Sequence, residues 1–271
     1  MSITKLTIKN FSLEKTLECG QCFRFMLNND NRYMGVIDSK GVSLEQIGNT
    51  IIAKGEVSYE ELSSFFTMDV DYTKIEKIMT KDNTLKHILE YSSGIRVLRQ
   101  PLFEALITFI LSSNNNIKRI TSLVASLCLH FGKQIDDNLY DFPSPEVLAS
   151  LNIDELSVIR CGFRDKYILD ASRKWVEGDI SGETISLAPL EEAREELMKI
   201  KGVGPKVADC TLLFGASRFD AFPKDVWIKR AMKELFPCGL PESLEEYAGI
   251  VQQYIFYYAR NMISDSTITI S

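Results

Sequence analysis

A lysine and an aspartate nineteen positions apart are the side chains of this sequence best suited to act together on a substrate. Lys206 follows the turn sequence GVGP at 202–205, and Asp225 opens the segment DVW. An amine can capture a carbon atom as a Schiff base, and a carboxylate can stabilise the positive charge that builds on that carbon. Because a free lysine is protonated at neutral pH, the surrounding fold must favour the neutral amine.

The glycine turn indicates how the fold favours it. Gly202 and Gly204 allow backbone angles closed to other residues, and Pro205 suits the first position of a helix, so the segment predicts a helix–hairpin–helix junction. The positive end of the second helix disfavours the ammonium form of Lys206, and its free amide groups can bind phosphate. Taken alone, the two glycines are better explained as a turn between core helices.

Asp225 precedes the helical pattern VWIKRAMKEL and is predicted to cap that helix. Capping by itself would explain an aspartate here. It is also compatible with catalysis, because backbone N–H groups that donate to a carboxylate keep it ionised and fixed in position.

Composition narrows the class of protein. The chain has 271 residues, 45% of them hydrophobic, with no apolar run long enough to span a membrane and no signal-like start, so we expect a cytoplasmic protein. Six scattered cysteines and two histidines suit neither a disulfide scaffold nor a zinc or iron–sulfur site. We therefore expect reduced thiols, no metal and no cofactor.

The charge is unevenly distributed. The formal net charge of −6 argues against a nucleic-acid partner, yet residues 201–233 hold seven Lys/Arg against three Asp. Residues 91–132 hold four Lys/Arg and one Glu, whereas 134–198 are strongly acidic. A basic face and an acidic face can therefore coexist.

Two kinds of periodicity follow one another along the chain. Residues 32–55 alternate between turn signals and predict an antiparallel meander, while YEELSSFF, an Asp71-capped YTKIEKIM and NTLKHILEYS predict helices. From Pro101 onward the pattern is helical and indicates no second sheet. The expected fold class is α+β, with an N-terminal sheet and helices at 1–95 and a mostly helical domain at 96–271.

Six segments resemble, in family order, the 8-oxoguanine DNA glycosylases of the helix–hairpin–helix superfamily. They are ECGQCFRF (18–25), FILSSNNNIKRI (109–120), CGFRDKY (161–167), GVGPKVADC (202–210), FPKDV (222–226) and AGIVQQYIF (248–256). The resemblance implies an enzyme that flips 8-oxoguanine, paired with cytosine, out of duplex DNA and excises it through a Schiff base on Lys206. β-Elimination would then nick the strand, and Asp225 would orient and help activate the lysine. We expect a monomer without a cofactor.

The resemblance also implies a base pocket. Cys210 and Phe214 share a helix face with the lysine, and Gln252 and Phe256 lie four apart on the last helix. In the family, the residue at the Cys210 position lies against one face of the flipped base, and the main-chain carbonyl at Gly20 senses the N7–H of the lesion. Gln252 would hydrogen-bond a purine edge, and Phe256 would offer a stacking surface. Core packing, or for Gly20 a plain turn, is the alternative explanation.

Further residues are implied to contact the DNA itself. Asn114 would fill the space left by the flipped base, Arg119 and Arg164 would bind the orphaned cytosine, and Phe163 would wedge into the stack. Asn116 would cap the following helix. Each arginine alone would more often be a solvated charge.

One position departs from the family pattern. Trp227 stands where eukaryotic members have histidine, and this difference puts in doubt how this part of the site contacts the DNA backbone.

Two other functions stay open. A monofunctional alkylbase glycosylase would use the aspartate and water, and a non-enzymatic helix–hairpin–helix protein would use Lys206 only to bind phosphate.

Overall fold

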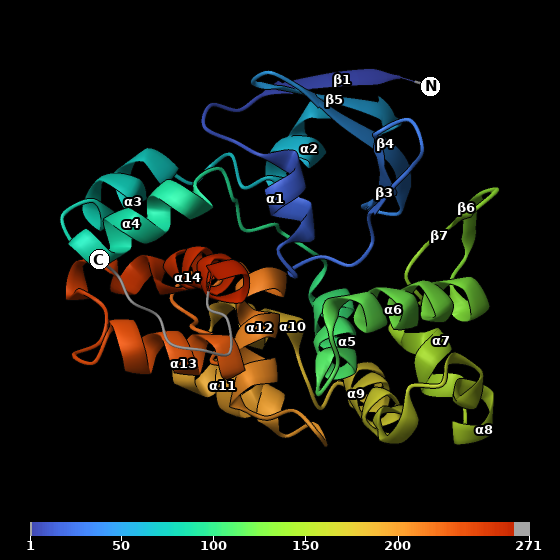
Figure 1. The fold of residues 1–271 in the computed structure, drawn as a ribbon. Helices are drawn as coiled ribbons and strands as arrows, with labels where there is room; N and C mark the ends of the chain where they lie inside the picture. The colour runs from blue at the N-terminus through green and yellow to red at the C-terminus, as the bar shows by residue number, and fades with distance from the viewer. Residues whose placement is uncertain (1, 263–271) are drawn as a thin grey trace.

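The computed structural model describes residues 2–262 and begins with a five-stranded antiparallel sheet (Figure 1). The strand order is β1-β5-β4-β3-β2. The strands are β1 (Ile3–Thr7), β2 (Met26–Leu27), β3 (Tyr33–Ile37), β4 (Lys40–Ile47) and β5 (Thr50–Gly55). The predicted meander is confirmed in β3, β4 and β5.

Local sequence explains this register. Asp38 and Ser39 both have positive φ, at 47° and 62°, which suits the two-residue turn between β3 and β4. The inward residues Leu44, Ile51 and Ala53 are fully buried in a core that the sheet shares with the first helices. β1 pairs with β5 and was not predicted, because one short alternating stretch at a chain end carries little periodicity.

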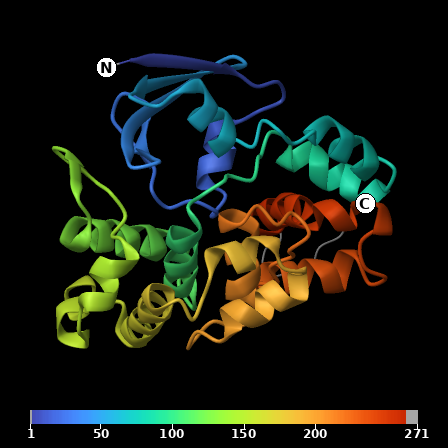
Figure 2. The ribbon, with the colours of Figure 1, turned by 180° about the vertical axis from the view of Figure 1, so that it is seen from behind.

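Two N-terminal helices, α1 (Leu13–Glu18) and α2 (Tyr59–Phe65), lie on the sheet, whereas α3 (Tyr72–Met79) and α4 (Asn83–Ser92) lie against the last helix (Figures 1 and 2). Asp71 caps α3 as predicted, accepting from the Lys74 backbone N–H at 3.1 Å. The buried side chains of α3 and α4 belong to the core of the helical domain. The domain boundary near residue 95 stays a prediction.

The rest of the described chain is mainly helical. Its α-helices are α5 (Leu102–Ser112), α6 (Ile117–Phe131), α7 (Pro145–Ser150), α8 (Ile153–Leu156), α9 (Asp165–Glu177), α10 (Gly182–Leu187), α11 (Leu190–Met198), α12 (Pro205–Gly215), α13 (Val226–Leu235) and α14 (Ala248–Met262). Short 3-10 turns are η1 (Ser157–Ile159), η2 (Gly162–Arg164) and η3 (Glu242–Tyr247). The almost wholly buried α5 lies against α12 at the centre of this domain.

The expectation of no second sheet is wrong. Strands β6 (Gln134–Asp136) and β7 (Leu139–Tyr140) form a small antiparallel hairpin after α6. Two strands this short, with an irregular register, leave no alternation to detect. The hairpin packs against the first sheet. Leu139 of β7 lies so close to Gly41 of β4 that a Cβ added at Gly41 would be 3.1 Å from a Leu139 methyl group.

The CGQC segment and the last helix, α14, meet beside the helical core. The Gln253 side chain in α14 donates to the carbonyl oxygen and the sulfur of Cys19, at 3.3 and 3.2 Å. Both cysteines of the CGQC segment are buried, and all six cysteines are free thiols, as expected. No helix within residues 2–262 is long and apolar enough to cross a membrane.

Candidate active site

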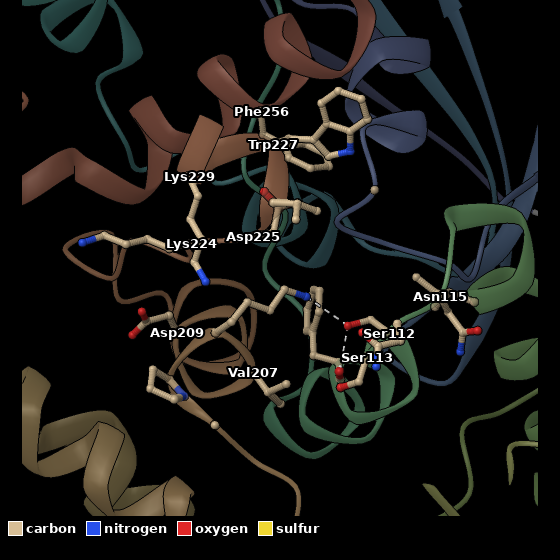
Figure 3. A pocket seen from close by; sticks show the side chains of 18 of the residues that line it. Ser112, Ser113, Asn115, Val207, Asp209, Lys224, Asp225, Trp227, Lys229 and Phe256 are labelled. Carbon is tan, nitrogen blue, oxygen red and sulfur yellow. Dashed lines mark hydrogen bonds between the residues drawn. The ribbon is translucent and has the colours of Figure 1, made fainter. Parts of the chain in front are cut away.

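A pocket of about 1450 Å³ lies where the C-terminal end of α5 meets the N-terminal ends of α12 and α13 and the middle of α14 (Figure 3). It brings together many residues singled out in the sequence. The predicted site residues that line it are Gly20, Asn114, Gly202, Gly204, Lys206, Asp225, Trp227 and Phe256. These residues come from five separate stretches of the chain.

Lys206 lies in the first turn of α12, as the hairpin sequence predicts. The cap residue Gly204 has no side chain to satisfy the free amide groups at this helix end. The Lys206 ammonium or amine nitrogen donates to the hydroxyl oxygen of Ser112 at 3.1 Å and lies 5.4 Å from the ring centre of Phe109. A dashed line ending on Ser112 marks the hydrogen bond in Figure 3.

Asp225 caps α13 as predicted, with its carboxylate accepting from the Ile228 backbone N–H at 2.8 Å. Burial raises the pKa of this carboxyl, while the backbone N–H groups and the nearby Lys206 lower it. Desolvation therefore opposes the effect of the cap and outweighs it, so the pKa of this carboxyl is higher than that of an exposed aspartate. No hydrogen bond or ion pair within residues 2–262 joins Asp225 to Lys206.

Cys210 and Phe214 lie on the same face of α12 as the lysine but behind the pocket wall. Burial raises the pKa of the Cys210 thiol to about 11, although the neighbouring Lys206 lowers it. Phe214 stacks on Phe109, with ring centres 5.1 Å apart and planes 21° apart. This stack lies under the lysine, since Phe109 is the ring nearest its terminal nitrogen.

Gln252 is buried behind the pocket-lining Phe256. Its amide nitrogen donates to the carbonyl oxygen of Pro223 at 3.2 Å. Its buried side-chain oxygen has no hydrogen-bond partner among the described residues. An unsatisfied buried acceptor is costly, so it marks a place where a donor from a bound molecule would be stabilised.

Gly20 enters the same region from the N-terminal segment, with a φ of +84°. A Cβ at this position would lie 2.7 Å from the end of Ile117 and 3.6 Å from the ring of Phe256. Only glycine therefore lets the main chain approach this closely.

The predicted DNA contacts are not all directed into the pocket. Arg164 is buried and donates to the carbonyl oxygens of Ser113 and Cys161, and Arg119 donates to the carbonyl oxygen of Arg160 at 2.8 Å. Neither arginine lines the pocket, whereas the exposed Asn114, with a φ of +53°, lies at its rim.

Phe163 is 53% exposed, and the guanidinium group of Arg164 lies 4.5 Å from its ring centre. An exposed ring beside a cation suits insertion into stacked bases. Asn116 caps α6 as predicted, accepting from the Arg119 backbone N–H at 2.8 Å.

The site contains residues that the sequence did not single out. Ser112 and Phe109 contact the lysine from α5, and the exposed Lys224 and Lys229 flank Asp225 on the pocket wall (Figure 3). The two lysines could have been found, because both lie within four residues of the aspartate. Nothing in the sequence distinguishes Ser112 from the other serines.

Comparisons with known proteins agree with this arrangement. Residues 3–106 match the model of the 8-oxoguanine DNA glycosylase N-terminal domain, and residues 107–250 match that of the HhH-GPD superfamily of base excision DNA repair proteins. The N-glycosylase/DNA lyase of Saccharomyces cerevisiae is 34% identical over 82% of this chain and 67% of its own length. The N-glycosylase/DNA lyase OGG1 of Arabidopsis thaliana is 32% identical over 82% and 66%. The chain thus spans about two thirds of the length of these relatives.

Solved structures are similar over nearly the whole chain. MBOgg1, in complex with a low-affinity DNA ligand, is 36% identical with a TM-score of 0.90, covering 97% of this chain and 96% of that one. The Clostridium acetobutylicum 8-oxoguanine glycosylase/lyase, bound to double-stranded DNA with cytosine opposite 8-oxoG, is 32% identical with a TM-score of 0.85, covering 96% and 98%. The two family matches together span most of the sequence, and the chain belongs to the 8-oxoguanine DNA glycosylase family of helix–hairpin–helix base excision repair enzymes.

Proposed function

We propose that this protein excises 8-oxoguanine paired with cytosine from duplex DNA and then cleaves the strand, using Lys206 as nucleophile. The observation that carries the proposal is the terminal nitrogen of Lys206 inside a pocket that also holds the Asp225 carboxyl group. The enzyme acts as a monomer on DNA inside the cell.

The chemistry follows from these two groups. As the bond between the base and C1′ breaks, positive charge builds on the sugar and the Asp225 carboxylate stabilises it. The base departs with the electron pair and a proton, and the Lys206 nitrogen bonds to C1′. Ring opening, with a proton passing to O4′, gives the Schiff base. Loss of a C2′ proton then expels the 3′ phosphate by β-elimination.

Recognition of the base rests on the other pocket residues. A flipped purine carries N–H donors on its Watson–Crick edge, and the partnerless oxygen of Gln252 can accept one of them. The ring of Phe256 offers a stacking surface, and the close approach of the Gly20 main chain allows its carbonyl to accept from the N7–H of the lesion. Unmodified guanine has a bare acceptor at N7 and gains no such bond.

The DNA contacts complete the proposal. Asn114 fills the vacated space, Phe163 wedges into the stack, and Arg119 and Arg164 turn from their carbonyl partners to the orphaned cytosine. The glycosylase/lyase of Clostridium acetobutylicum, crystallised with cytosine opposite 8-oxoG, is the relative whose substrate supports this choice.

Borohydride reduction during turnover tests the mechanism. With a duplex holding 8-oxoguanine opposite each of the four bases in turn, we expect a trapped covalent complex, strongest opposite cytosine, and none with Lys206→Gln. Lys201→Gln is the matched control, because Lys201 lies on the same hairpin but is exposed and paired with Asp170. Full excision by Lys206→Gln would overturn the proposal.

Alkylbase excision is the second candidate, because two Bacillus subtilis relatives named as 3-methyladenine glycosylases, one of them putative, match 60–64% of the chain at 26–29% identity. Such an enzyme would need only Asp225 and water. Release of 3-methyladenine without release of 8-oxoguanine would favour it. If Asp225→Asn changed no measured property, a non-enzymatic DNA-binding role would be the better account.

A further inference from the structure

Ser112 is the last residue of α5 and lies 7% exposed beside the pocket. Its hydroxyl group makes two hydrogen bonds in opposite directions. The hydroxyl donates its one hydrogen to the Phe109 carbonyl oxygen at 2.7 Å, and its oxygen accepts from the Lys206 nitrogen at 3.1 Å. The bond to Phe109 fixes the hydroxyl rotor, so a lone pair of Ser112 faces the lysine.

Ser112 supplies the hydrogen bond that reaches the Lys206 nitrogen from outside α12, at 3.1 Å. Within α12, the Cys210 thiol also interacts with Lys206, and no ion pair within residues 2–262 ties the lysine to Asp225. The Phe109 ring, braced by its stack on Phe214, supports the same end of the side chain. A lysine side chain is otherwise free to sample many rotamers.

We infer that Ser112 is a positioning residue for the nucleophile, holding the Lys206 nitrogen where it can reach C1′ of a flipped nucleotide. The inference deepens the proposed function and rests on it. By accepting one N–H bond, Ser112 engages an N–H of a neutral amine and leaves its single lone pair free to point into the pocket. Ser112 itself touches neither the base nor the sugar in this mechanism.

The test compares Ser112→Ala with wild type in single-turnover excision of 8-oxoguanine opposite cytosine. We expect the excision rate to fall about 10-fold or more, since small misplacements of reacting groups cost this much. The borohydride-trapped fraction at early times should fall in parallel, while affinity for a duplex with an uncleavable lesion analogue stays within about twofold. Ser112→Thr, which keeps the hydroxyl, should recover most of the rate.

Ser172→Ala is the matched control. Ser172 is also a buried helical serine, and its hydroxyl donates to the Ile168 carbonyl oxygen at 2.8 Å, but neither residue lines the pocket. This variant should lose as much thermal stability as Ser112→Ala and keep the wild-type rate.

Three results would overturn the inference. The first is a Ser112→Ala variant that excises at the wild-type rate. The second is a Ser112→Ala variant whose defect lies wholly in DNA affinity. The third is a fall in the excision rate of Ser172→Ala as large as that of Ser112→Ala. If the wild-type protein forms no trapped complex at all, the proposed function is refuted, and so is this inference.

Discussion

Asp225 carries two requirements on one carboxyl group. It caps α13 through the Ile228 N–H and faces the pocket that holds Lys206. Burial raises its pKa, so the carboxylate form that the proposed catalysis needs is destabilised relative to an exposed aspartate.

Removing that charge while keeping the cap separates the two roles. Asparagine caps helices about as well as aspartate, so Asp225→Asn should bind lesion DNA normally but excise at a rate about 100-fold lower. Single-turnover kinetics with a binding titration measure both. A variant with undiminished rate would remove Asp225 from the mechanism.

The wild-type protein should lose excision activity as the pH falls through the pKa of Asp225. Because burial raises this pKa, the loss should begin at a higher pH than for an enzyme that relies on an exposed aspartate.

The same substitution should stabilise the protein. The pKa of Asp225 is higher in the folded protein than in the unfolded chain. The folded state is therefore favoured at low pH, where the carboxyl group is protonated, and this stabilisation is lost as the pH rises through the folded-state pKa. The buried carboxylate therefore destabilises the folded protein near neutral pH. Asp225→Asn should raise the melting temperature more at about pH 7 than at about pH 4. The control is Asp71→Asn at the exposed cap of α3. Equal shifts for both variants would contradict the argument.

Sequence could single out Lys206 and Asp225 as candidates, mainly because the segments around them resemble the family, and the structure places both at one pocket. It could not identify Ser112, which lies 94 positions before the lysine in the sequence and meets it only after α5 has docked on α12. Nor could it give the acidity of Asp225, since burial is a property of the assembled pocket.

Among the elements, the hairpin between α11 and α12 contains two glycines with different roles. Gly202 has a φ of +80°, and a Cβ there would lie 2.3 Å from the Tyr167 ring. Gly204 has an ordinary φ of −101°, and a Cβ there would meet nothing within 4 Å. The first position needs glycine for both conformation and space, and the second does not.

Alanine substitutions should distinguish them. Gly202→Ala should lower the free energy of unfolding by about 1–3 kcal/mol through strain and the displaced ring, whereas Gly204→Ala should stay within about 0.5 kcal/mol. Urea unfolding measures both. Equal losses would mean that the hairpin tolerates Gly202→Ala by shifting away from Tyr167.

Helices and strands were largely predictable where the hydrophobic pattern extends over many residues or where a capping residue marks a helix start. The Asp71, Asn116 and Asp225 caps all lie where side-chain chemistry predicts. The elements that were missed are short ones that carry little periodicity. They are β1, β2, α1, α10 and the β6–β7 hairpin.

The whole molecule is joined across its two cores by a buried ion pair. Arg24, between the sheet and the CGQC segment, lies 2.9 Å from Glu104 of α5, with both side chains about nine-tenths buried. Arg24 also donates to the Tyr140 carbonyl oxygen in the β6–β7 hairpin. One guanidinium group thus links sheet, helical core and hairpin.

Arg24→Met should therefore be costly, because it leaves the Glu104 carboxyl group buried without its partner. We expect a loss of about 3 kcal/mol or more in the free energy of unfolding. The control is Arg32→Met at the half-exposed pair with Glu45, which should cost under about 1 kcal/mol. Chemical denaturation of the three proteins measures the difference, and a loss in Arg24→Met no larger than the control would show that the pair is dispensable.

The link between Gln253 and Cys19 joins residues 234 positions apart in the sequence, next to Gly20 and Gln252. Any shortened form of the protein that ends before α14 would still contain the five-stranded sheet, α5 and α12, but it would lack Gln252 and Phe256. Base recognition as proposed would then be lost even in a fragment that still carries Lys206 and Asp225.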